Sequence, residues 1–132
     1  MKTKKRSDVL TLALNKPWFE MIKSGVKTEE YREIKKSYIG RFFDMDAMLK
    51  AFTEAGGPND RELAFANAVN CGTWVNFLKK FTKLVLTCGY PSKTDRSRRL
   101  EFDGPHIDIG CGKTEWGAVP DKKYFVITWK DA

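Results

Sequence analysis

Residues 25–32 read Gly-Val-Lys-Thr-Glu-Glu-Tyr-Arg and directly follow a short amphipathic segment that is typical of a helix. Glycine readily adopts a positive φ, so Gly25 suits the corner between the end of that helix and a strand. Side chains alternate between the two faces of a strand, which places Glu30 and Arg32 on the same face. Lys27 stands at the corner, where its long side chain can reach them. The octet therefore predicts a helix-to-strand corner that carries a cluster of charge.

The charges of this octet allow two interpretations. In the first, Lys27 and Glu30 form a solvated ion pair at a strand edge, which contributes roughly 0–1 kcal/mol. In the second they form a site, because a desolvated lysine can act as a general base or nucleophile, or as a fixed cation for an oxyanion. Glu30 can orient that lysine or accept hydrogen bonds from a base edge, and Arg32 offers a planar fork for phosphate. The spacing alone leaves both interpretations open.

The pattern of the octet, G-x-K-x-x-E-x-R, resembles the signature of the ASCH domain, a branch of the PUA-like β-barrel superfamily. Other segments are similar to strands and to the first helix of bacterial and phage members of this family: residues 10–19, 89–90, 107–112, 115–118 and 124–127. The matching segments lie toward both ends of the chain, whereas the stretch from about 42 to 81 matches less well.

This resemblance implies an α+β fold, namely a PUA-like β-barrel of about five or six strands with packed helices. The less similar stretch would be a helical insertion at about 42–81 within a single domain, residues 1–132. The resemblance also implies that Lys27, Glu30 and Arg32 line a cleft, and that the chain binds RNA or a nucleotide-like ligand there.

Two other functions stay open. Some ASCH relatives hydrolyse an acylated cytidine with the motif lysine, a threonine at the position of Glu30, and a distant glutamate. A small hydrolase of this kind, or a ribonuclease, would use Lys27 and Glu30 as catalytic residues. No residue matches the distant glutamate by motif, and Glu101 and Glu115 are candidates for it. The third possibility is a protein-interaction module of a transcription or translation complex. Whether the protein is an enzyme is therefore not decided by its sequence.

Composition agrees with a globular protein that has a polyanionic partner. The chain has 132 residues, of which 42% are hydrophobic and 13% aromatic. Its net charge is +7 and its pI is about 9.4, and a basic balance of this kind suits RNA, because phosphate contacts release counterions. No apolar run reaches the roughly 18 residues that a membrane helix needs.

The cysteines and the single histidine narrow the chemistry further. The chain has three cysteines, Cys71, Cys88 and Cys111, with no C-x-x-C spacing. An odd number of cysteines without this spacing favours reduced, buried thiols in a cytoplasmic protein. Because His106 is the only histidine, a histidine-based zinc site is not expected. We expect no metal and no cofactor. The Gly110–Thr114 run lacks the upstream glycine and the helix of a P-loop.

Aromatic and basic residues form a second candidate surface, since single-stranded nucleic acid is held by stacking rings beside a positive groove. Trp18 also suits packing in the core or at its rim, whereas Tyr90, between glycine and proline, is better placed for exposure. The charged segment 91–99 is expected to be a mobile basic loop between strands. The candidate ligand-binding residues outside the octet's charged trio are Lys16, Trp18, Tyr31, Tyr90, Arg96, Arg98 and Arg99.

Hydrophobic periodicity predicts the remaining elements. Strands are expected over residues 8–14, 27–34, 84–87, 98–102, 106–109 and 124–129. Helices are expected from Pro17 to Gly25, from a cap at Asp44 or Asp46 to Gly56, from a cap at Asn59 or Asp60, and over 74–81.

Overall fold

The computed structural model describes residues 8–130, and over these residues the protein has four α-helices and one mixed sheet of five strands. The expected α+β class is confirmed. The sheet is not a closed barrel, because it has two edge strands. The described chain falls into two compact units: a sheet unit, 8–33 and 81–130, and a helical unit, Ile34–Lys80.

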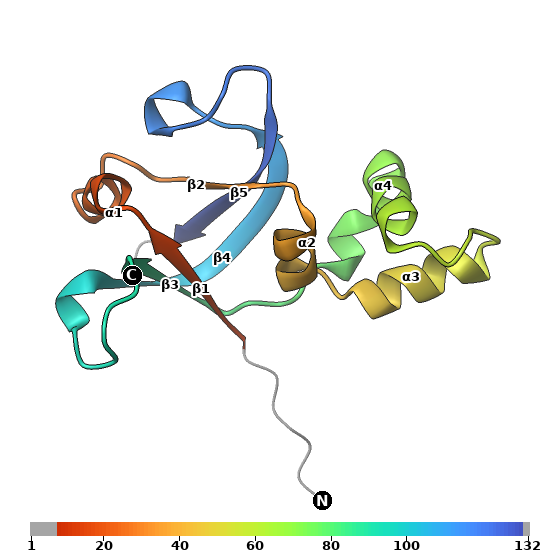
Figure 1. Cartoon of the computed structure of the whole chain (residues 1–132), viewed down its shortest axis with the longest axis horizontal. Coiled ribbons are helices and arrows are strands. Elements are labelled where there is room, and N and C mark those ends of the chain that lie inside the picture. Colours follow the sequence, from red (N-terminus) through yellow and green to blue (C-terminus); the bar gives the residue numbers. More distant parts are fainter. Residues whose placement is uncertain (1–7, 131–132) are drawn as a thin grey trace, which may run out of the picture. The chain divides into compact units, whose positions relative to one another are not determined.

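The sheet unit has the strand order β1-β3-β4-β5-β2 (Figure 1). β1 (Val9–Leu14) runs parallel to β3 (Lys83–Cys88), and every other neighbouring pair is antiparallel. The central strand, β4 (Arg99–Cys111), is long and visibly curved in Figure 1. β5 (Lys123–Lys130) follows it, and β2 (Glu30–Glu33) is the far edge. The first and last strands thus belong to one sheet, as expected.

Alternating apolar side chains build the core of this unit. Leu10, Leu12 and Leu14 are buried on one face of β1, and Leu12 is level with Leu86 of β3. Helix α1 (Lys16–Lys23) contributes its own buried positions and lies against β3. The other buried apolar residues of the sheet face and of α1 are Phe19, Ile22, Leu84, Ile107, Phe125 and Ile127.

One expectation about β4 was wrong. Residues 98–102 and 106–109 are not separate strands but parts of one strand with an irregularity between Asp103 and His106. Gly104 lies within it at φ 54°, a conformation that glycine tolerates well. A bulge of this kind bends a strand without ending it. Gly104 and Pro105 therefore do not form a turn between two separate strands.

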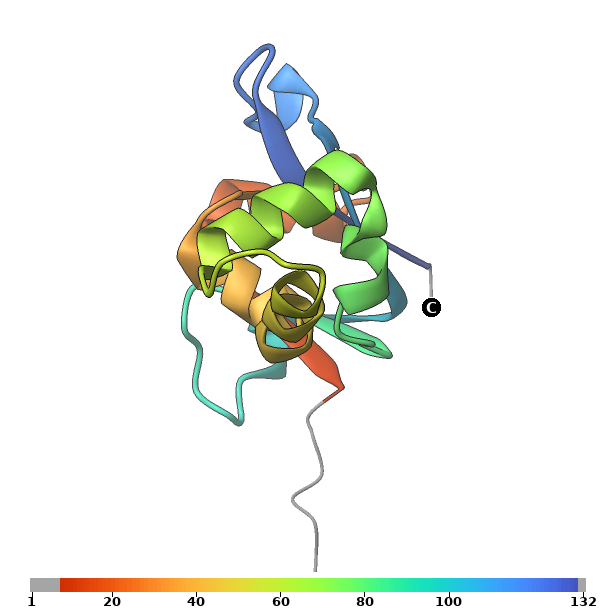
Figure 2. The same cartoon turned by 90° about the vertical axis from the view of Figure 1, so that its right-hand side faces the viewer.

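The helical unit contains α2 (Lys36–Phe42), α3 (Met45–Glu54), α4 (Arg61–Cys71) and a short 3-10 helix, η1 (Thr73–Phe77). Figure 2 shows α3 nearly end-on and α4 from the side, so the two helices cross. The expected caps are found, since Asp44 accepts a hydrogen bond from the amide of Ala47, and Asp60 accepts two from α4. Helix α2 was not predicted, and its N-cap, Lys35, makes no capping bond through its side chain.

The expected helix over 74–81 is also wrong. Gly72 adopts a left-handed conformation with φ 74°, which ends α4 and leads into η1. After Phe77 the backbone is extended, and Leu78 forms a β-bridge with Phe43. Trp74 nevertheless packs edge-on against the buried Phe43, with ring centroids 6.3 Å apart. The pairing of Leu78 with Phe43 therefore outweighs the helical periodicity of residues 74–81.

Burial of the cysteines differs from the expectation. Cys71 and Cys111 are exposed, Cys88 is half-buried, and all three are free thiols. No helix within residues 8–130 combines the length and the apolar character needed to cross a membrane.

The cap at Asp60 gives the first prediction. Its carboxylate accepts hydrogen bonds from the amides of Glu62 and Leu63, so Asp60→Ala should lower the free energy of unfolding by about 1 kcal/mol. Asp60→Asn, which retains a capping oxygen, should lose much less. Urea unfolding followed by circular dichroism measures both. Equal stability of Asp60→Ala and the wild type would contradict the importance of this cap.

Candidate functional site: a buried ion cluster at the edge of the sheet

The chain turns sharply between α1 and β2, and this turn places Lys27. Gly25 has φ 85°, and its amide donates to the carbonyl of Ile22. The amide of Lys27 then donates back to the carbonyl of Met21 at 3.0 Å. The predicted corner at Gly25 is confirmed, although β2 begins at Glu30 rather than at Lys27.

The three charged side chains of the octet form one cluster. The ammonium of Lys27 lies 2.6 Å from Glu30 Oε1, and the guanidinium of Arg32 lies 2.7 Å from Glu30 Oε2. The side chain of Lys27 is 0% exposed, that of Glu30 10% and that of Arg32 14%. The interpretation as a solvated surface pair is therefore wrong. Glu30 is a buried carboxylate shared by two cations.

The cluster lies on the core face of the sheet, at the edge strand β2. In the β2–β5 register Glu30 is level with Ile127 and Arg32 with Phe125, and both apolar partners are fully buried. Arg32 also donates at 2.7 Å to the backbone carbonyl of Ala13 in β1. Because β1 and β2 are the two edges of the sheet, this bond joins one edge to the other across the seam where a barrel would close.

Two aromatic rings cover the ammonium of Lys27. Its nitrogen lies 5.7 Å from the ring centroid of Trp18 and 5.5 Å from that of Tyr31, within the range of cation–π contacts. The β4–β5 connection approaches these rings at two glycines. A Cβ atom at Gly117 would lie 3.0 Å from Trp18, and one at Gly112 would lie 2.7 Å from Tyr31. A side chain at Gly112 would force its neighbours to shift, and one at Gly117 would have little room.

The phenol of Tyr31 links the β4–β5 connection to the start of β2 by two hydrogen bonds. The hydroxyl of Tyr31 donates to Glu29 Oε1 at 2.7 Å and accepts from the amide of Lys113 at 2.9 Å. Glu29 lies directly before β2, so its hydrogen bond also ties the start of the strand to Tyr31. The ammonium of Lys27 also donates to the backbone carbonyl of Glu29 at 2.6 Å.

Burial changes the acid–base behaviour of this cluster. Desolvation lowers the pKa of Lys27, while the neighbouring carboxylate of Glu30 opposes that shift. Burial also raises the pKa of Tyr31 to about 12. A neutral lysine could serve as a base, but this ammonium is enclosed and already holds two acceptors. The side chain of Lys27 has no exposed surface, so a ligand cannot contact it in this arrangement, and the role of the trio as a cleft lining stays a prediction.

Among the other predicted ligand-binding residues, Trp18 and Tyr31 cover the ammonium of Lys27, whereas most of the rest are exposed. Tyr90 is 96% exposed, which agrees with the expectation for its position. The segment 91–99 is not entirely loop, because Arg96–Arg98 form a short 3-10 helix capped by Asp95. The remaining candidates are the exposed Lys16, Arg96 and Arg98 and the half-buried Trp18, Tyr31 and Arg99.

A hollow of about 450 Å³ lies beside this basic segment. Its lining consists of Lys93, Arg96, Arg99 and Glu101. Arg99 is held in place by the carbonyls of Ser92 and Pro91, at 3.0 and 3.4 Å. Within the sequence, Glu101 stood out only as a candidate for a catalytic carboxylate. The structure places it among three cations.

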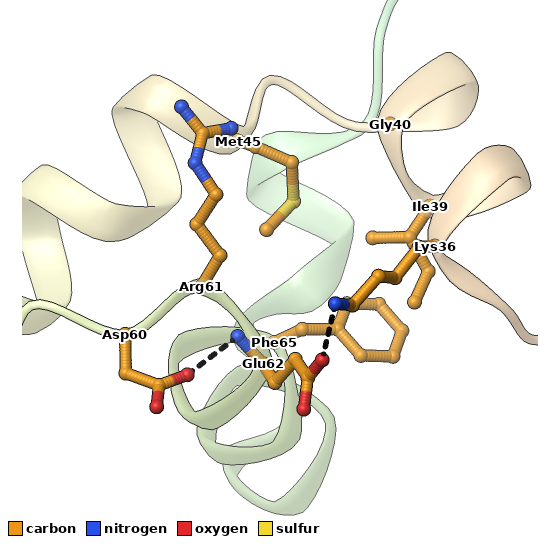
Figure 3. Close-up of a pocket in the computed structure, with 8 residues that line it drawn as sticks. All are labelled: Lys36, Ile39, Gly40, Met45, Asp60, Arg61, Glu62 and Phe65. Carbon is orange, nitrogen blue, oxygen red and sulfur yellow. Dashed lines mark hydrogen bonds and ion pairs between the residues drawn. The ribbon is translucent and has the colours of Figure 1, made fainter.

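A second hollow, of about 540 Å³, lies in the helical unit and was not predicted (Figure 3). Its apolar lining comes from Ile39, Met45 and Phe65. At its rim the ammonium of Lys36 lies 2.8 Å from Glu62, in an ion pair that is largely exposed. Such a hollow can take a small apolar group. Its residues come from α2, α3 and α4, so no local sequence motif could predict this hollow.

No protein-family model, curated protein or solved structure matches this chain. Within residues 8–130 no three His, Cys, Asp or Glu side chains are grouped so that they could hold a metal ion.

The shared carboxylate gives a stability prediction. Glu30→Gln leaves Lys27 and Arg32 without a counter-charge on the core face, so it should cost about 3–5 kcal/mol of unfolding free energy. Lys27→Met keeps the Glu30–Arg32 pair and should cost clearly less. Glu33→Gln removes an exposed carboxylate from the same strand and serves as the matched control, with about 0–1 kcal/mol expected. If urea unfolding finds Glu30→Gln no worse than this control, the cluster is not a structural centre.

The phenol of Tyr31 gives a pH prediction. Its pKa is raised to about 12 from an ordinary 10.0, so the folded state retains a proton that the unfolded state releases first. The resulting stabilisation is complete below pH 10 and is lost as the pH rises toward 12. The unfolding midpoint in urea should therefore fall more steeply over this range for the wild type than for Tyr31→Phe. Parallel curves for the two proteins would rule out a perturbed phenol.

Proposed function

We propose that the protein is a cytoplasmic RNA- or nucleotide-binding domain of the ASCH type, with an incompletely closed PUA-like sheet. The octet G-x-K-x-x-E-x-R supports the family. The seam closed by Arg32 and Ala13 supports the relation to a barrel, since the two edge strands lie within reach of one side chain.

The observations that carry the binding proposal are the exposed ring of Tyr90 and a cationic hollow whose Arg99 donates to the carbonyl of Pro91, the residue that follows Tyr90. A tyrosine that is 96% exposed offers a face on which a base can stack, and the hollow lined by three cations supplies positive charge for phosphate. A stacking ring next to a positive groove is the usual arrangement for single-stranded nucleic acid. The net charge of +7 favours the same class of partner.

In this proposal the octet has a structural role: it stabilises the sheet that carries the binding surface and does not itself contact the ligand. Lys27 is fully enclosed, and Arg32 is engaged with Glu30 and Ala13. Trp18 and Lys16, on α1, are close in sequence to this cluster and can extend the contact surface. The cluster would act by holding the sheet in the shape that presents the exposed residues.

A small hydrolase is the second candidate, and the lowered pKa of Lys27 favours it. If Lys27 is a base or nucleophile, Lys27→Arg should abolish turnover of an acylated nucleoside, because arginine stays protonated. If the protein is a binder, the same change should leave RNA affinity substantially intact. A panel of acylated nucleosides with product detection separates the two candidates.

The binding proposal predicts a steep dependence on salt. Replacing Arg96, Arg98 and Arg99 together by Gln should weaken binding of a fluorescent U12 RNA and reduce the slope of log affinity against log salt by about 2. The matched control replaces three exposed lysines of the same unit, Lys23, Lys83 and Lys123, by Gln and should change affinity less. Tyr90→Ala should weaken binding at every salt concentration, whereas Tyr90→Phe should not. If fluorescence anisotropy detects no binding to the wild type at low salt, RNA is not the partner.

A further inference from the structure

The hollow next to the basic segment 91–99 carries charges of both signs. Its lining residues comprise three cations, Lys93, Arg96 and Arg99, and one carboxylate, Glu101. A volume of about 450 Å³ is within the range of small-molecule sites, which is roughly 300–1,000 Å³. The hollow is thus large enough for one nucleotide and carries a net charge of +2.

These charges are available to a ligand. Within residues 8–130, Lys93, Arg96 and Glu101 take part in no ion pair. The nearby Asp95 is occupied, since it accepts hydrogen bonds from Ser97 and lies 3.5 Å from the guanidinium of Arg98.

Arg99 is positioned before any ligand arrives. Its guanidinium donates to the carbonyls of Pro91 and Ser92, so the backbone fixes its direction without neutralising its charge. A charged group that is already oriented loses less conformational freedom on binding. Since Pro91 follows Tyr90, the same contact fixes the backbone next to the exposed ring.

A carboxylate among cations suits a ligand that has both an anionic and a hydrogen-donating part. A nucleotide has both, because its phosphate suits the cations and its base edge can face Glu101. Guanine presents two adjacent donors, N1–H and N2–H, to the two carboxylate oxygens, whereas uracil presents a single N–H. Cytosine can offer its N4 amino group to a carboxylate, and adenine sets an acceptor, N1, beside its amino group.

We infer that this hollow is a nucleotide subsite within the proposed RNA-binding surface, and that Glu101 makes it prefer guanine over uracil. The phosphate lies against Lys93, Arg96 and Arg99, the base edge faces Glu101, and the ring of Tyr90 stacks on a base of the bound strand. This inference rests on the proposed RNA-binding function and adds base selectivity to it.

The test compares the affinities of short RNAs that differ in one base. Fluorescence anisotropy would measure binding of U8 and of U8 variants with one central G, C or A, so that no oligomer can fold on itself. The wild type should bind the G-containing octamer about tenfold more tightly than U8, which is the size of discrimination that a bidentate contact gives. Cytosine should be intermediate.

Glu101→Gln tests the residue itself. Glutamine keeps the size of the side chain but replaces one acceptor by a donor, so the ratio of G to U affinity should fall to near one while U8 binding is retained or strengthened. Glu115→Gln makes the same charge change at an exposed carboxylate of the same unit and should retain the preference. A structural role of Glu101 would change both affinities together and not their ratio.

The possible failures are distinguishable. If the wild type binds all four octamers equally, the inference is wrong and the proposed RNA binding stands. If the preference for guanine survives in Glu101→Gln, the assignment to Glu101 is wrong. If no octamer binds, the proposed function itself is overturned.

Discussion

The structure depends on a carboxylate, Glu30, that binds two cations on the core face of a sheet. Removing charges from water is expensive, and attraction repays that expense only where each charge has a close partner. Here Lys27 and Arg32 each have an oxygen of Glu30 within 2.7 Å, and each also donates to a backbone carbonyl. One of those carbonyls belongs to the opposite edge strand, so satisfying the charges also sets the separation of the edges.

Several features elsewhere in the sheet unit follow from this constraint. An ammonium inside the fold needs a polarisable cover, which Trp18 and Tyr31 supply. Those rings leave no room for a Cβ at Gly112 without a shift, and little at Gly117. The side chains of the octet are largely occupied with one another, which is why the proposed ligand surface uses Tyr90 and the residues after it.

Some of these features were predictable from sequence and others were not. Alternation correctly placed Glu30 and Arg32 on one face, and glycine chemistry marked the corner at Gly25. The burial of the trio was not predictable, because charged side chains are rarely buried and the acceptor in Ala13 is a backbone atom. Helix α2, which has no side-chain cap, was missed, and the periodicity of 74–81 misled because Leu78 pairs with Phe43. Closure of the sheet into a barrel depends on strand register, which alternation does not determine.

The most direct test of the proposed division of roles is nuclear magnetic resonance of the amide groups during titration with a single-stranded RNA octamer containing one guanine. The octet is assigned a structural role, and the surface from Tyr90 to Glu101 is assigned the ligand. The largest chemical-shift changes should therefore fall within residues 90–101, with only small changes in residues 25–32. Changes concentrated in residues 25–32, with residues 90–101 unaffected, would contradict this assignment and would make the buried trio the ligand site.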